Sequence, residues 1–141
     1  MDAFDADVLI YAAVPDHPLG RRVAALFPPG HVAADSPPVG VGSVLLVPEL
    51  LSKPLASGKT DETAALTWLL ARLDLRPLDA ATATLAAALG ERYGLRAADA
   101  AHLATAVASG ADRFITNNHR DFSVTIAEVS VTYPDVLRDS E

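Results

Sequence analysis

The stretch "GLRAADAAHLATAVASGADRFIT", residues 94–116, decides the fold, because it places a helix and a strand in direct succession. Its alanine-rich part predicts a helix over residues 96–110, which Gly110 closes. The segment "DRFIT", residues 112–116, predicts a strand. The loop "NNHRDF" follows that strand at once, so polar side chains are expected where the strand ends.

The same alternation of helix-like and strand-like segments extends to both ends of the chain. The run over residues 3–11 is short, apolar and rich in Val, Ile, Tyr and Phe, and it predicts a buried strand. The other expected strands cover residues near 39–41, 75–78 and 126–134, and the other expected helices cover 43–58, 60–73 and 79–93, with one more starting at Asp16-His17-Pro18. Alternating elements predict an α/β protein with a mostly parallel central sheet and helices on both faces.

Three helices have an expected start or cap. These starts are Ser43, either Thr60 or Asp61, and Asp79, while Gly94 is expected to end the helix that Asp79 opens.

The composition limits the class of protein. A chain of 141 residues predicts a single domain over 1–141, and half of its residues are hydrophobic, which is enough for a sizeable core. The absence of cysteine excludes disulfides, thiolate zinc sites and a cysteine nucleophile. No apolar run approaches the roughly 20 residues of a membrane helix, and the N-terminus lacks the features of a signal peptide. A cytoplasmic location is therefore expected.

The net charge of −7 argues against a protein that binds nucleic acid through bulk positive charge. It does not exclude a nuclease, because a site for divalent cations must itself be acidic and the bound metal reverses the local sign. An acidic surface also suits a basic protein partner.

Four carboxylates stand in contexts that are unusual for surface residues: Asp5, Glu49, Asp99 and Asp121. Each has apolar neighbours in the sequence, and two of them follow or interrupt a predicted strand. Ligands of open α/β sheets gather at the carboxyl ends of the strands. Carboxylates collected there form a hard-oxygen site suited to Mg²⁺ or Mn²⁺, which can turn water into a nucleophile.

Each polar residue also has a simpler interpretation. Asp7 can cap or turn the chain after the first strand, Glu49 alone can be a solvated helix residue, and His102 is better explained as a packed or supporting residue than as a ligand. Residues of the last loop can be solvated or can shape a turn: Thr116, Asn118, His119 and Arg120.

Four segments resemble, in order, the motifs of PIN-domain ribonucleases: "FDADVLIYAA", "VPELL", "GLRAADAAHLATAVASGADRFIT" and "TNNHRDF". The length and the segment "DAAHLATA" are most similar to VapC-like toxins of type II toxin–antitoxin modules. The resemblance spans nearly the whole chain, and residues 94–116 are its most specific part. It implies a compact three-layer α/β/α sandwich and an endoribonuclease that depends on Mg²⁺ or Mn²⁺.

Carried over motif by motif, the resemblance assigns the catalytic and metal-binding acids to Asp5, Glu49, Asp99 and Asp121. The first motif of the family usually has Asn, Ser or Thr where this chain has Asp7. One version of the last motif has Asp where this chain has Asn118. A second version, Thr-x-Asn-x-x-Asp-Phe, fits "TNNHRDF" fully and gives the acid to Asp121.

The resemblance also implies supporting groups and partners. Thr116 and Asn118 would hold the loop or the attacking water, Asp7 would contact metal or orient Asp5, and Arg120 and Arg96 are candidates for contacts with the RNA backbone. The expected partners are an RNA substrate, an antitoxin with a basic arm and a second copy of the chain in a homodimer.

Three other classes of protein share part of this pattern. "FDADV" fits the first motif of haloacid-dehalogenase-like phosphatases, but Lys53 and Lys59, the only lysines, both precede the later acids, and a phosphoacceptor signalling domain lacks a lysine for the same reason. A PIN-like protein–protein interaction module with a weakened site remains open, because Asn118 occupies a position that holds an acid in part of the family.

Overall fold

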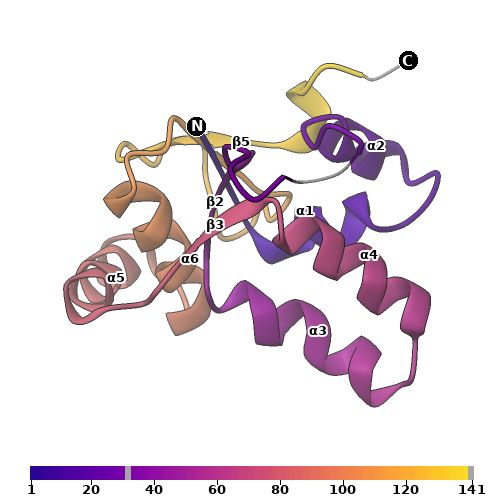
Figure 1. The fold of residues 1–141 in the computed structure, drawn as a ribbon. Coiled ribbons are helices and arrows are strands. Elements are labelled where there is room, and N and C mark those ends of the chain that lie inside the picture. Colours follow the sequence, from indigo (N-terminus) through magenta and orange to yellow (C-terminus); the bar gives the residue numbers. More distant parts are fainter. Residues whose placement is uncertain (31–32, 140–141) are drawn as a thin grey trace.

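The computed structural model describes residues 1–30 and 33–139. At its centre is a five-stranded, fully parallel sheet (Figure 1). Its spatial order is β3-β2-β1-β4-β5. The strands are β1 (Asp2–Phe4), β2 (Gly40–Ser43), β3 (Leu73–Arg76), β4 (Arg113–Ile115) and β5 (Ser130–Thr132). The predicted α/β class and parallel central sheet are confirmed.

Helices cover both faces of this sheet and produce three layers (Figure 1). They are α1 (Ala6–Ala12), α2 (Pro18–Ala24), α3 (Leu46–Ala56), α4 (Thr60–Leu70), α5 (Ala80–Tyr93) and α6 (Ala97–Ala108), followed by the 3₁₀ turn η1 (Pro134–Val136). None of the helices in the described part of the chain is long and apolar enough to cross a membrane.

Alternation along the strands builds two separate cores. Ala3 and Phe114 point to one face, where α5 and α6 pack, and both are buried with Leu103. Phe4 and Ile115, their neighbours in sequence, point to the opposite face and join the core under α1, α3 and α4. Successive side chains of a strand face opposite sides, so two adjacent residues serve two cores and the sandwich follows.

The predicted strand over residues 3–11 is wrong beyond Phe4, because α1 begins at Ala6. Asp5 has extended backbone angles (φ −82°, ψ 163°) and caps the helix by accepting from the Ala6 N–H. Val8 and Leu9 are fully buried while Ile10 is 41 % exposed, which gives a helix with one apolar face. Burial of that face overrides the strand preference of the β-branched residues.

Other boundaries of helices and strands also differ from those predicted from the sequence. Ser43 does not open a helix; it ends β2, and its hydroxyl accepts from the Leu45 N–H before α3 starts. The cap of α4 is Lys59 rather than Thr60 or Asp61, and it makes no side-chain capping bond. The last strand is shorter than the predicted 126–134.

Both ends of α5 were predicted correctly. Asp79 caps the helix by accepting from the Thr82 N–H, and Gly94 ends it in the left-handed conformation (φ 64°).

Backbone pairing continues past the carboxyl ends of β1 and β4. The Asp5 N–H donates to the Ile115 carbonyl (2.9 Å), and the Thr116 N–H donates to the Thr132 carbonyl (3.2 Å). The residues that follow β1, β4 and β5 are therefore held side by side at one edge of the sheet, and this edge carries the candidate site.

Candidate functional site

The candidate acids stand at this edge, each positioned by a helix start or by the loop after β4. Asp5 caps α1, Asp7 lies in the first turn of α1, Glu49 in the first turn of α3 and Asp99 in the first turn of α6. Asp121 lies in the loop that follows β4. The positive end of a helix dipole favours negative charge, so four of the five carboxylates stand where the backbone partly offsets their charge.

Asp5 is the most buried of these groups, with 5 % of the residue exposed. One carboxylate oxygen accepts from the Ala6 N–H (2.9 Å), and the other accepts from the Thr116 hydroxyl (2.8 Å). Burial raises the pKa of Asp5 above its usual range, although both hydrogen bonds act in the opposite direction. The carboxylate is thus held in one orientation at the junction of β1, β4 and α1.

Asp7 connects α1 to the loop after β4. Its oxygens accept from the Val8 N–H (2.7 Å) and from the Asn117 N–H (3.0 Å). Burial, followed by repulsion from Asp5, raises the pKa of Asp7 to about 7. The structure therefore shows Asp7 holding this loop, a contact that the sequence did not reveal.

The four carboxylates Asp5, Glu49, Asp99 and Asp121, called the acidic cluster from here on, lie close enough to act on one another electrostatically. Burial raises the pKa of Asp99, and repulsion from the other three members raises it further. Repulsion from Glu49 also raises the pKa of Asp5. Asp99 is therefore within electrostatic range of three carboxylates that come from other segments of the chain.

Their arrangement is not a finished coordination shell. Within residues 1–30 and 33–139, no three His, Cys, Asp or Glu side chains are placed to hold one metal ion together. Mg²⁺ is usually bound through one or two carboxylates and keeps several of its waters. Mutually repelling, partly buried oxygen ligands fit such a cation, and the acidic cluster supplies them.

His102 is a basic side chain that acts electrostatically on the acidic cluster, since it lowers the pKa of both Asp5 and Asp99. It is 3 % exposed, and its Nε2 atom contacts a carboxylate oxygen of Glu49. A carboxylate can only accept, so Nε2 is assigned as the donor. His102 is therefore packed, as expected from the sequence, and it also fixes Glu49, a contact that the sequence did not reveal.

The loop after β4 is held by a short chain of hydrogen bonds. The Thr116 hydroxyl donates to Asp5 and accepts from the Asn118 N–H (3.1 Å). The Asn118 side chain donates to Asp121 (2.9 Å), and its carbonyl oxygen accepts from the Asp121 N–H (3.2 Å). Asn118 thus orients the carboxylate of Asp121.

Two arginines lie beside these acids in the sequence. Arg96 caps α6 through its backbone, and Arg120 precedes Asp121; both are exposed. Neither side chain forms a hydrogen bond or an ion pair with the described residues. They are cations available to an anionic ligand.

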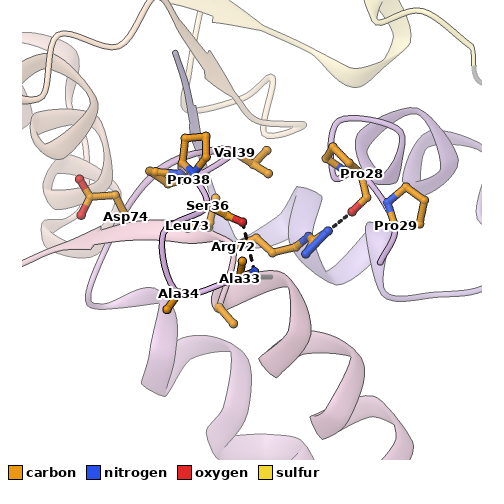
Figure 2. A pocket seen from close by; sticks show the side chains of 12 residues that line it. Pro28, Pro29, Ala33, Ala34, Ser36, Pro38, Val39, Arg72, Leu73 and Asp74 are labelled. Carbon is orange, nitrogen blue, oxygen red and sulfur yellow. Dashed lines mark hydrogen bonds between the residues drawn. The ribbon is translucent and has the colours of Figure 1, made fainter. Parts of the chain in front are cut away.

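A cavity of about 720 Å³ lies elsewhere, at the amino ends of β2 and β3 (Figure 2). Its walls include Val39, Leu73 and several prolines, and none of the acidic cluster lines it. Figure 2 shows the buried Arg72 reaching toward Pro28, whose carbonyl accepts from its guanidinium. Arg72 also lies over the Trp68 ring at 4.1 Å. It therefore connects the segment around Pro28 to α4 and does not contribute to the acidic cluster.

Comparison with known proteins supports the same fold. The family model described as the PIN domain matches residues 3–127. The toxin–antitoxin complex from Klebsiella pneumoniae contains a similar chain, with 22 % identity over 95 % of this chain and 98 % of that one and a TM-score of 0.69. A search of curated proteins found no match.

Two further solved structures are similar. One is VapBC2 from Rickettsia felis bound to a DNA fragment from its promoter, with 17 % identity, coverage of 94 % and 97 %, and a TM-score of 0.67. The other is FitAB bound to the IR36 DNA fragment, with 22 % identity, coverage of 98 % of each chain and a TM-score of 0.63. At these identities the likeness establishes the fold.

Mn²⁺ should stabilise the protein, because a cation that binds the folded state relieves repulsion within the acidic cluster. Binding at about 100 times the dissociation constant adds about 2.7 kcal/mol, which should raise Tm by several degrees. Asp5→Asn should raise the Tm of the metal-free protein and reduce the response to Mn²⁺. Thermal unfolding with and without Mn²⁺ measures both effects.

Asp61→Asn is the matched control, because Asp61 is an exposed acid in the first turn of α4. It should leave the response to Mn²⁺ intact. A wild-type protein whose Tm is insensitive to Mn²⁺ contradicts the metal site.

Replacing His102 should weaken the metal site through Glu49. His102→Leu removes the donor and should lower the affinity for Mn²⁺ by about 10- to 100-fold, the usual effect of losing a group that orients a metal ligand. His102→Gln keeps an N–H donor and should retain most of the affinity. Isothermal titration calorimetry compares the two variants, and equal losses would exclude an orienting role.

Proposed function

This chain belongs to the PIN domain family, and we propose that residues 1–141 form one PIN domain that hydrolyses RNA phosphodiesters in the cytoplasm with Mg²⁺ or Mn²⁺. The observation that supports this most is the acidic cluster, in which burial and mutual repulsion raise the pKa of Asp5 and Asp99. Partly buried carboxylates without a cation are costly to the fold. A bound divalent cation would offset this free-energy cost, which explains why the carboxylates are clustered.

The acidic cluster would hold the cation. Once bound, the cation would supply a Lewis acid for the phosphate and lower the pKa of the attacking water. The protein's own groups keep the carboxylates in place: Thr116 orients Asp5, His102 orients Glu49 and Asn118 orients Asp121. No serine or histidine nucleophile is required.

Arg96 and Arg120 are the groups we assign to the RNA backbone. Both are exposed, and each lies within three residues of a member of the acidic cluster. Guanidinium groups recognise phosphate through charge-assisted hydrogen bonds. They would supply local positive charge to an RNA strand that approaches a protein whose net charge is −7.

We also propose that the nuclease is the toxin of a toxin–antitoxin pair and forms a homodimer. The supporting facts are the acidic surface and the similar chains in complexes described as toxin–antitoxin, VapBC2 and FitAB. A site made of carboxylates is most simply blocked by an arginine or lysine on a flexible arm. The net charge would also speed the association of such a basic segment.

The alternative is a PIN-like module that binds a protein partner without catalysis. It is favoured by the lack of a finished metal-coordinating group within the described residues and by Asn118, which stands where part of the family has an acid. Activity measurements separate the two candidates.

Purified protein should cleave single-stranded RNA in Mn²⁺ and lose this activity in EDTA. Asp99→Asn should reduce cleavage to background while preserving the fold, because the change removes a charge and keeps the size of the side chain. Gel analysis of a labelled RNA measures cleavage, and circular dichroism verifies the fold. Folded wild-type protein that leaves every RNA intact in Mn²⁺ supports the non-catalytic module.

A basic partner should silence the protein. Expression of the wild type alone should arrest growth, co-expression with the partner should restore growth, and Asp99→Asn should be harmless by itself. The affinity of the complex should fall as salt rises, because screening weakens attraction between an acidic surface and a basic segment. Binding measured at several salt concentrations tests this, and an affinity independent of salt would exclude the charge-based mode.

A further inference from the structure

His119 and Tyr133 form a stacked pair of rings at the edge of the sheet where β1, β4 and β5 end. Their ring centroids are 3.7 Å apart and their planes differ by 12°. His119 lies in the loop after β4, two residues before Asp121, while Tyr133 directly follows β5. Because β4 and β5 are parallel neighbours, their carboxyl ends place the pair at the edge that carries the acidic cluster.

Tyr133 is a fixed support for this pair. Its hydroxyl donates to the Phe122 carbonyl (2.6 Å), and the Pro134 that follows it is buried. Phe122 is itself fully buried and packs edge-on against Phe114, a residue of β4. The tyrosine ring is therefore anchored to the core.

His119 is held on one face and one edge. Tyr133 covers one face of its ring, and the ring atom Nε2 lies 3.3 Å from the side-chain oxygen of Asn117. His119 is nevertheless exposed, so its accessible surface lies on the ring face and edges that Tyr133 and Asn117 leave uncovered. A flat ring with one covered and one open face can accept a further ring on the open side.

The residues next to His119 hold its loop in place and add a positive charge beside the ring. The Asn117 N–H donates to Asp7 in α1, and the Asn118 side chain donates to Asp121 in the same loop, so the loop that carries the ring is held against the start of α1. Arg120, the next residue, is exposed and unpaired within the described part of the chain. A ring and a cation side by side match the two parts of a nucleotide, its base and its phosphate.

We propose that the open face of His119 stacks on an unpaired base of the RNA substrate, next to the scissile phosphate, with Tyr133 as its support. This rests on the proposed ribonuclease function and adds the contact that selects a single-stranded, splayed nucleotide. Proteins that read single-stranded RNA stack its bases on aromatic side chains. Because His119 is already ordered by Tyr133 and Asn117, binding a base costs little conformational entropy.

Binding of a fluorescent single-stranded RNA of mixed sequence, measured by anisotropy with Ca²⁺ in place of Mn²⁺, tests the proposal. Gel analysis verifies that the RNA stays intact. His119→Ala should weaken binding about tenfold, the usual effect of losing one stacked base. His119→Phe should bind within about twofold of the wild type, since any flat ring can stack, and His119→Leu should resemble His119→Ala.

A second arm identifies the base. Single abasic nucleotides are placed in turn along the RNA, and one position should weaken binding to the wild type. The same position should have no effect on His119→Ala, because the stacking contact is already lost. Val124→Ala is the control, since Val124 lies in the same loop and is 63 % exposed, and it should leave binding unchanged.

The outcomes separate this proposal from the function on which it rests. Wild-type protein that binds no RNA overturns both. RNA binding that is unchanged in His119→Ala, or equally weak in His119→Ala and His119→Phe, overturns the stacking contact alone. The Mn²⁺-dependent rise in Tm should be the same in His119→Ala and in the wild type, and a lost response would show that the substitution damages the metal site instead.

Discussion

The buried carboxylate of Asp5 is the constraint on which the edge of the sheet depends. The backbone N–H of Asp5 extends the pairing of β1 with β4. One carboxylate oxygen caps α1, and the other accepts a hydrogen bond from the Thr116 hydroxyl. A single residue thus ends a strand, starts a helix and fixes the loop that carries Asp121. Burial of an acid is unfavourable unless its oxygens are paired, and here each oxygen has a donor supplied by the backbone or by an adjacent loop.

The same edge stores unfavourable electrostatic energy. Asp99 has a raised pKa because burial and three other carboxylates oppose its charge. The starts of α1, α3 and α6 offset part of this repulsion, since backbone N–H groups at a helix start favour anions. His102 offsets another part, since it lowers the pKa of Asp5 and Asp99. The remainder is a local conflict between charge and burial of the kind that proteins keep at functional sites, which is why a cation is the simplest partner for it.

The sequence predicted the elements better than their junctions. Alternating segments and the apolar periodicity of residues 94–116 were enough for the parallel sheet and for α6, because local preference and tertiary burial agree there. Residues 5–11 were assigned to the wrong element, since Val, Leu, Ile and Tyr prefer strands locally and only packing against α2 and α3 makes them helical. The His119–Tyr133 stack could not be predicted, because it depends on β4 and β5 being neighbours, and strand order is a long-range property of the sheet.

An acidic protein that binds RNA must replace bulk attraction with local contacts, and the edge of this sheet offers three kinds. The acidic cluster can be neutralised by a divalent cation, which turns a repulsive surface into one that accepts phosphate. Arg96 and Arg120 provide charge beside it. The proposed stacking on His119 would add affinity that does not depend on net charge, because every base has a flat face. Each contact acts over a short range, so the net charge of −7 can still repel RNA elsewhere on the surface, while an RNA strand that reaches this edge would be held there.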